Sequence, residues 1–235
     1  LEVEHEDRAA KLYYVSYPIA GSTEKLTVAT TRPETILGDT AVAVNPHDPR
    51  YGRFVGKTAV VPLVGREVPV IADEHVDIGF GTGALKITPG HDPDDWEIGL
   101  RHGLPSVSVI GLDGLMTEEA GEFTGLTTTE ARKAVIERLE EEGLFVKAED
   151  YNHAVSACYR CGTTIEPLLS LQWFMGMERL VQPAIKVVED GRVRFVPDRW
   201  GEVYLNWMRG IRPWCVSRQL WWGHRIPAYF CEECE

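Results

Sequence analysis

Residues 84–95 read ALKITPGHDPDD, in which a short strand pattern gives way to the start of a helix. Lys86 and Thr88 alternate along the predicted strand and therefore point to the same face of its sheet. A helix is expected over about 92–102, because acidic residues crowd its first turn, where the positive end of the helix dipole favours them. A strand with polar side chains thus leads directly into a helix with carboxylates.

Short runs rich in β-branched and aromatic residues continue the strand pattern on both sides of this stretch. They predict strands over 12–19, 25–31, 41–44, 58–64, 68–72 and 107–110, with a hairpin turn at Gly21-Ser22. A second helix is predicted over about 128–142, where Thr127 and Glu130 have the spacing of a capping box. Many short strands with few helices indicate an α+β fold, built as a bent sheet or barrel-like domain with a few flanking helices.

The composition is that of a globular protein. Of the 235 residues, 44% are hydrophobic and 26% are charged, which excludes disordered and collagen-like chains. No apolar run approaches the roughly 20 residues of a membrane span, and the acidic start LEVEHED is unlike a signal peptide. We therefore expect a cytoplasmic protein with no membrane partner, monomeric by default. Because the sequence has no initiator Met, we also expect a piece of a longer chain.

Four of the five cysteines form two Cys-x-x-Cys pairs, Cys158 with Cys161 and Cys231 with Cys234. Paired knuckles of this kind indicate a reducing compartment and a tetrahedral structural zinc site with these four ligands, in place of disulfides. The 69 residues between the pairs are too many for a simple ribbon loop and predict a folded insertion. A truncated or empty site is the alternative.

Charge is distributed unevenly along the chain. The net charge is −12, which by itself disfavours a nucleic-acid partner. Residues 191–229, however, hold seven arginines against two acidic residues, a net of +5, together with five of the seven tryptophans. Such a segment suits contacts with phosphates and stacked bases, or docking on other protein. Because the composition changes after about Tyr151, we expect one domain over 1–153 and a zinc-knuckle and connective region over 154–235.

Hydroxyl side chains and a guanidinium gather in residues 30–35, which read TTRPET. Pro33 stops the predicted strand at this point. The threonine hydroxyls can orient a water molecule, and Arg32 can hold a phosphate or a carboxylate. A threonine-rich turn with its own local hydrogen bonds is the alternative.

Asp92 and Asp95 stand three residues apart at the start of the predicted helix and share one of its faces. A carboxylate beside free backbone N–H groups is expected to stay ionised and to pair well with a substrate ammonium. Asp92 alone is better explained as a helix cap, which leaves Asp95 to be explained. The glycines of GFGTG at 79–83 precede a strand, so they form no dinucleotide fingerprint and instead allow close approach of the backbone to a ligand.

The chemistry that these groups support is hydrolysis by an oriented water. The sequence has no Gly-x-Ser-x-Gly elbow and no His-Glu-x-x-His zinc site. Hydroxyls, Lys86, Arg32 and carboxylates around one pocket would position water and stabilise charge on an acyl oxygen, with no cofactor for the reaction itself. Asp92 and His91 are the local candidates for a general base.

Three segments resemble the editing region of class I aminoacyl-tRNA synthetases and together cover nearly the whole chain. They are TTRPET with LGDT at 37–40, GTG at 81–83 through Asp95, and CVSRQLWWGHRIP at 215–227. The combination is closest to the valyl enzymes, since leucyl enzymes share only the first element and isoleucyl enzymes usually lack the WWGH form of the last. In this family the inserted domain hydrolyses mischarged threonyl-tRNA, because a pocket built for valine cannot strongly reject an isostere that adds a hydroxyl, a limit for which the valyl enzymes are a known example.

The resemblance also implies a role for each matching residue. Asp95 would bind the α-ammonium of the aminoacyl group, and Thr88 would lie near its side chain and ester. The terminal adenosine or its phosphate would be held by Arg32, Thr35, Lys86 and Phe80. Asp92 would also lie near the aminoacyl side chain and ester, and Thr30 and Thr31 would help to form the pocket and position water. These three would be the catalytic residues.

The partners implied by the resemblance are the 3′ acceptor end of tRNA(Val) and the remainder of a synthetase chain. The HIGH and KMSKS motifs of the ATP site are absent, so ligation of valine to tRNA is expected only of a longer parent. Two alternatives remain open at this point. One is a zinc-stabilised module that binds the acceptor end without chemistry, and the other is an editing domain of isoleucyl or leucyl parentage.

Overall fold

The computed structural model describes residues 3–219 and 221–231, and the chain divides into two compact units. Unit 1 is Leu1–Leu169 and unit 2 is Ser170–Glu235. The boundary expected after residue 153 falls inside a strand of unit 1, β7 (Phe145–Cys158). Within the described residues, no helix combines the length and the apolar character needed to cross a membrane.

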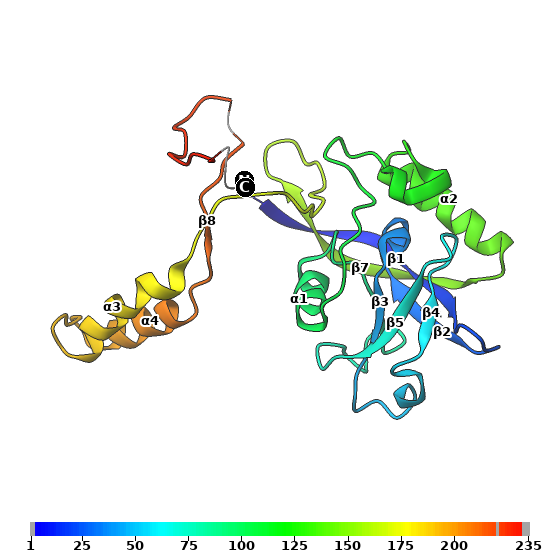
Figure 1. The fold of residues 1–235 in the computed structure, drawn as a ribbon, viewed down its shortest axis with the longest axis horizontal. Helices are drawn as coiled ribbons and strands as arrows, with labels where there is room; N and C mark the ends of the chain where they lie inside the picture. The colour runs from blue at the N-terminus through cyan, green and yellow to red at the C-terminus, as the bar shows by residue number, and fades with distance from the viewer. Residues whose placement is uncertain (1–2, 220, 232–235) are drawn as a thin grey trace. The chain divides into compact units, whose positions relative to one another are not determined.

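Unit 1 contains two sheets (Figure 1). The first has the order β2-β1-β7 and is antiparallel, with β1 at Val3–Pro18 and β2 at Lys25–Thr30. The second has the order β4-β5-β3-β6, formed by Thr58–Val60, Glu67–Ala72, Ala41–Val44 and Ala84–Ile87. In this second sheet β3 and β5 are parallel, and the other pairs are antiparallel.

One hydrophobic core lies between the two sheets. Val15 and Val28 contribute from the first sheet, Val42 and Val70 from the second, and all four are at most 1% exposed. An isolated bridge between Ile19 and Ala59 joins the end of β1 to β4, so the sheets are tied at one corner. The β-branched residues that predicted these strands supply much of this core. The α+β class is therefore confirmed.

Two α-helices and three short 3₁₀ helices complete unit 1. The α-helices are α1 (Pro93–His102) and α2 (Thr128–Glu141), and the 3₁₀ helices are η1 (Pro33–Gly38), η2 (Gly52–Phe54) and η3 (Glu118–Phe123). The capping box of Thr127 and Glu130 is present at the start of α2, as predicted. Helix α2 packs against η1 and β7, and so buries the outer side of the TTRPET turn.

Two sequence expectations were wrong in detail. Residues 107–110 form no strand within the described residues, because the backbone N–H groups of Val109 and Ile110 donate to the His91 ring. Strand β7 was not predicted, and it pairs with β1 along most of its length. Its run EDYNHAV is mostly polar, so it lacks the enrichment in β-branched and aromatic residues by which the other strands were predicted.

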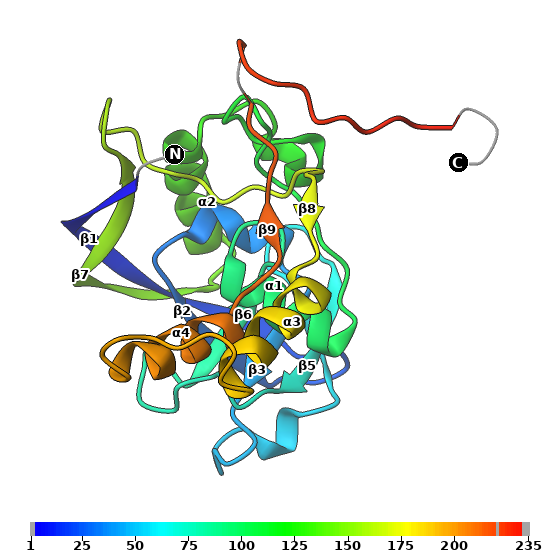
Figure 2. The same ribbon diagram turned by 90° about the vertical axis from the view of Figure 1, so that its left-hand side faces the viewer.

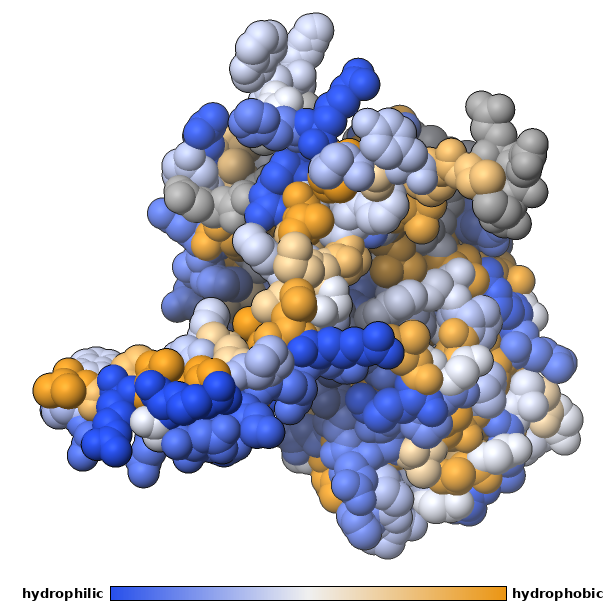
Figure 3. Space-filling model, turned by 60° about the vertical axis from the view of Figure 1, so that its left-hand side comes forward, coloured by the Kyte–Doolittle hydropathy of each residue, from blue (hydrophilic) through white to orange (hydrophobic). Residues whose placement is uncertain are grey.

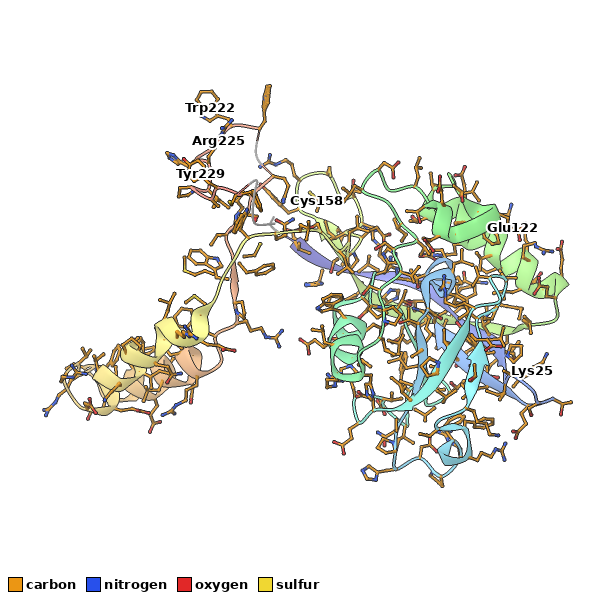
Figure 4. The ribbon with its side chains drawn as sticks, in the orientation of Figure 1. Lys25, Glu122, Cys158, Trp222, Arg225 and Tyr229 are labelled. Atoms are coloured by element: carbon orange, nitrogen blue, oxygen red, sulfur yellow. The ribbon has the colours of Figure 1, made fainter. Side chains whose placement is uncertain are left out.

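Unit 2 is a helical hairpin joined to a two-stranded ribbon. It consists of β8 (Phe174–Met175), α3 (Met177–Glu189), α4 (Arg199–Arg209) and β9 (Trp214–Cys215), and the two strands are seen together in Figure 2. Only Val181 and Ile185 of α3 are buried, and no residue of α4 is. Figure 3 shows hydrophobic and hydrophilic side chains mixed over the exposed surface of this hairpin. The Arg/Trp-rich segment thus keeps its aromatic side chains outside any core, and Trp222 and Tyr229, labelled in Figure 4, are 93% and 94% exposed.

Candidate active site

A cavity of about 330 Å³ lies where β2, η1, β6 and the start of α1 meet. All nine residues assigned to catalysis or substrate binding line it, namely Thr30, Thr31, Arg32, Thr35, Phe80, Lys86, Thr88, Asp92 and Asp95. They come from β2, η1, β6, α1 and the loops beside these elements, up to 65 positions apart in the sequence, and the two sheets bring them together. Their shared location follows from the fold, whereas their individual roles remain predictions.

Helix α1 begins at the wall of this cavity. Asp92 is its N-cap, and Asp92 Oδ1 accepts hydrogen bonds from the backbone N–H groups of Asp94 at 2.9 Å and Asp95 at 3.2 Å. The capping role foreseen for Asp92 is therefore present. The cap orients the first turn so that the Asp95 side chain points inward, where it is 5% exposed. Asp95 Oδ2 accepts the backbone N–H of Thr88 at 2.8 Å.

Asp95 differs from expectation in its charge state. The pKa of Asp95 is raised to about 7, mainly by burial. Lys86 opposes the rise, and the nearby carboxylates of Asp92 and Asp39 contribute to it. We expected the N-terminal backbone N–H groups to keep this carboxylate ionised, but those of α1 are taken up by the Asp92 cap. A buried carboxylate that accepts one backbone hydrogen bond is thus suited to pair with a cationic group of a ligand.

A buried polar network supports the cavity wall from below. Asp39 is fully buried, and its Oδ2 accepts the Tyr17 hydroxyl at 2.5 Å while its Oδ1 accepts the Thr88 hydroxyl. Lys86 Nζ donates to Thr88 Oγ1 at 2.6 Å and lies 3.6 Å from Asp39 Oδ1. Burial raises the pKa of Asp39 to about 6, and Lys86 is the main group that opposes this rise. Asp39 belongs to the LGDT segment, and no role was predicted for it from the sequence.

The direction of these hydrogen bonds fixes what the wall offers to a ligand. An ammonium group can only donate, so the hydrogen of the Thr88 hydroxyl is committed to Asp39 when Asp39 is ionised. The remaining lone pair of Thr88 Oγ1 can only accept, and Lys86 Nζ, 2.6 Å away, still has N–H groups to donate. A ligand group that contacts both atoms must therefore donate to one and accept from the other, as a hydroxyl or a water does.

His91 is not available as a base. Its ring is 1% exposed, and Nε2 accepts the backbone N–H groups of Val109 at 2.8 Å and Ile110 at 3.2 Å. Nδ1 lies 3.4 Å from the carbonyl oxygen of Pro167, which requires the proton to be on Nδ1. Burial lowers the pKa of His91 to about 4. Both ring nitrogens are occupied by the fold, so His91 holds three segments together and Asp92 is left as the local candidate.

The TTRPET turn combines both of its predicted characters. Arg32 donates its backbone N–H to Thr30 Oγ1 at 3.1 Å, and Thr35 Oγ1 donates to the Arg32 carbonyl at 2.9 Å, as expected of a threonine-rich turn. The Arg32 guanidinium nevertheless lines the cavity. Its Nη1 donates to the carbonyl oxygen of His91 at 2.9 Å, and its Nη2 donates to Glu166.

Aromatic residues that the sequence analysis did not assign extend the cavity wall. Tyr151 and His153, two apart on β7, stack with ring centroids 5.7 Å apart, and Phe80 meets Tyr151 edge-on at 5.9 Å. His75 lines the cavity as well. The only available signal was the spacing of Tyr151 and His153 on one face of a strand, which required β7 to be predicted first.

The first cysteine knuckle lies at the end of β7, where Cys158 is labelled in Figure 4. A hydrogen bond with the Thr163 side chain is the main cause that lowers the pKa of Cys161, and a bond with the Thr163 backbone adds to it. The lowered pKa favours the thiolate that a metal requires. Cys231 belongs to unit 2, and Cys234 lies outside the described residues. Among the residues described, no group of three or more potential ligands lies close enough to hold a metal ion.

Comparisons with known proteins match this chain along its whole length. The family model of tRNA synthetases class I (I, L, M and V) covers residues 1–235. A valine–tRNA ligase of Carboxydothermus hydrogenoformans is 58% identical over 100% of this chain and 27% of its own length. One of Thermotoga maritima is 57% identical over 99% of this chain and 27% of its own length.

The chain thus spans about a quarter of the length of these curated relatives. Among solved structures, a LeuRS of Agrobacterium radiobacter K84 in a ternary complex with tRNA and LeuAMS has a TM-score of 0.48 at 22% identity. That match covers 69% of this chain and 24% of the LeuRS chain. On the family model and the two close relatives, the chain belongs to the class I tRNA synthetases of the I, L, M and V group.

Proposed function

We propose that unit 1 is an editing hydrolase of a valine–tRNA ligase, which cleaves the ester of mischarged threonyl-tRNA(Val). The observation that carries this proposal is the convergence of a buried carboxylate, Asp95, and the Lys86–Thr88 donor and acceptor pair on one cavity. The close valine–tRNA ligase relatives support valyl over leucyl or isoleucyl parentage.

Asp95 accounts for recognition of the amino acid's α-ammonium. The carboxylate is buried with a single backbone hydrogen bond, so an ammonium placed against it restores a charge partner in a site of low dielectric. Binding of the cation lowers the pKa of Asp95 from about 7, so the complex is favoured in its ionised form. A neutral or acylated amine would lose this contact.

The Lys86–Thr88 pair accounts for selection of threonine over valine. The threonine hydroxyl can donate to the remaining lone pair of Thr88 Oγ1 and accept a remaining N–H of Lys86 Nζ. A valine methyl in that place would cover both groups without bonding either one. A site built to bond a hydroxyl rejects the analogue that lacks it far more strongly than an apolar pocket rejects an added hydroxyl. The network through Asp39 keeps Thr88 in its accepting role.

Hydrolysis then needs a water beside the ester. A water adds to the acyl carbon and the bond to the ribose oxygen breaks, which releases threonine and a tRNA with a free terminal hydroxyl. Thr30 and Thr31 are in place to orient that water. Asp92 Oδ2 receives no hydrogen bond from the described part of the chain, so it is the side-chain oxygen available to take the water's proton.

The test is deacylation by the 235-residue chain. We expect threonyl-tRNA(Val) to be hydrolysed about 10⁴-fold faster than valyl-tRNA(Val), the order expected when a polar site meets an analogue that lacks the hydroxyl. Equal rates for both substrates would contradict hydroxyl selection. Salt-sensitive tRNA binding without hydrolysis would instead support the alternative, a module that binds the acceptor end without chemistry.

The proposals of a bound zinc ion and of macromolecular partners rest on the sequence. A chain purified from cells is expected to hold about one zinc ion, lost on Cys161→Ser but kept on Cys215→Ser, the cysteine outside the knuckles. The tRNA(Val) acceptor end and the remainder of a ligase chain are the proposed partners. Ligation of valine to tRNA is proposed only for a longer protein that contains this chain.

A further inference from the structure

Residues 165–168, near the end of unit 1, are held along the edge of the cavity by contacts with the rest of unit 1. The backbone N–H of Ile165 donates to Ser156 O at 2.9 Å, and Pro167 O meets His91 Nδ1. Leu168 packs against the core. Between these anchors, Glu166 pairs with Arg32, a cavity residue.

Glu166 occupies part of the Arg32 guanidinium that an anion would otherwise use. Nη1 of Arg32 donates to His91 O at 2.9 Å and Nη2 donates to Glu166, so both terminal nitrogens are engaged. Nε lies 3.6 Å from Glu34 Oε1. A phosphate is held best by two parallel N–H bonds from a guanidinium, and here that fork is already divided between two protein oxygens.

The charges around Arg32 show which carboxylate is the exchangeable one. Glu34 is fully buried and takes two hydrogen bonds from Arg132, at 2.8 and 2.9 Å, so its charge is already neutralised. Glu166 is therefore the partner that balances Arg32. The Arg32 and Glu166 side chains are 25% and 23% exposed, so solvent and a ligand can reach the pair.

We propose that Glu166 gates Arg32: it occupies the guanidinium while the cavity is empty and yields it to the phosphodiester of an incoming nucleic-acid 3′ end. The inference rests on the proposed function, because that function brings such an end to the cavity. The exchange keeps the local charge balanced, since one anion replaces another on the same cation. It also imposes a cost on every anion, so only a ligand that brings both a phosphate and a group filling the cavity displaces Glu166.

The test measures binding of cytidylyl-adenosine, which has one phosphodiester, and of adenosine, which has none, to the 235-residue chain. Glu166→Gln keeps the shape of the side chain and removes the competing charge. We expect the dissociation constant of cytidylyl-adenosine to fall about two- to fivefold, the range for a partly exposed ion pair, and that of adenosine to stay unchanged. Glu6→Gln, which breaks the Glu6–Arg8 pair outside the cavity lining with the same change of net charge, is the matched control and is expected to alter neither.

A double variant separates competition from a general effect. In an Arg32→Gln background, the gain from Glu166→Gln is expected to vanish, because the contested guanidinium is gone. Unchanged or weaker cytidylyl-adenosine binding by Glu166→Gln, an equal change for adenosine, or no binding by any variant would each overturn the gate. Deacylation of threonyl-tRNA(Val) by the unaltered chain is measured separately, so failure of the gate does not count against editing, nor the reverse.

Discussion

Glu34 and Asp95 are both carboxylates buried in unit 1, and they differ in what neutralises them. Glu34 is 0% exposed and takes two hydrogen bonds from the Arg132 guanidinium on α2. Asp95 is 5% exposed and takes one backbone hydrogen bond, from Thr88. A buried charge that the fold already pairs can hold the structure together, whereas one that the fold leaves short of a partner suits a ligand.

The largest effect is expected from Asp95→Asn, which removes the charge and keeps the shape. Loss of the partner for a desolvated ammonium costs about 2–5 kcal/mol, so deacylation of threonyl-tRNA(Val) is expected to fall by about 30-fold or more. The measurement is the single-turnover deacylation rate, with circular dichroism to verify folding.

Asp94→Asn is the matched control, because Asp94 also lines the cavity but is exposed and next to Asp95. We expect its rate to fall less than about threefold, since an exposed charge is screened by solvent. An equal loss in both variants would show that the cavity responds to total negative charge, and would remove the special position of Asp95.

Glu34→Gln tests the other member of the comparison. Removing this charge leaves Arg132 facing a neutral amide in a mostly buried pair, and we expect the free energy of unfolding to drop by about 2–3 kcal/mol. This is below the range for a fully buried pair because the Arg132 side chain is 38% exposed. Chemical denaturation measures it. Glu122→Gln, which breaks an exposed pair with Arg138, should leave the free energy of unfolding nearly unchanged.

The contrast between these carboxylates also shows which structural features could be predicted from the sequence. Local patterns predicted the Asp92 cap, the α2 capping box and most of the central strands, because each depends on residues within a few positions. The nine cavity residues were chosen by resemblance to a family, and the structure brings all nine to one cavity. Their roles stay predictions.

What the sequence could not supply are the partners across long separations. Nothing local distinguishes Glu34, which finds Arg132 98 positions away, from the other polar residues of TTRPET. The neutral state of His91 and the raised pKa of Asp95 depend on burial by 107–110 and on the Asp92 cap, so both followed only from the folded arrangement. Long β7 was missed for the related reason that its polar run becomes a strand by pairing with β1, which is distant in the sequence.

The difference in stability between Asp95→Asn and the unaltered chain should depend on pH. The pKa of Asp95 is raised to about 7 in the folded chain from about 4 when unfolded, so folding favours the protonated form. Its contribution to stability is fully present below about pH 4 and is lost as the pH rises through about 7. Relative to the unaltered chain, Asp95→Asn should therefore gain stability with rising pH.

The gain is expected to reach on the order of 2 kcal/mol by pH 8, less than the full shift implies because the cavity admits water. Thermal unfolding at pH 5 and pH 8 measures it. A variant that is less stable than the unaltered chain at pH 8 would show that ionised Asp95 holds the fold together as Glu34 does.

The smallest effect is expected from His91→Gln. Glutamine can supply one acceptor oxygen but not the geometry that serves both Val109 and Ile110, so one buried N–H loses its bond and unfolding should become easier by about 1–2 kcal/mol. Because His91 is neutral with a pKa of about 4, the pH dependence of deacylation between pH 6 and 8 should keep its midpoint. If that midpoint moves with His91→Gln but not with Asp95→Asn, the titrating group of the cavity is the histidine, and the distinction between paired and unpaired carboxylates does not explain the chemistry.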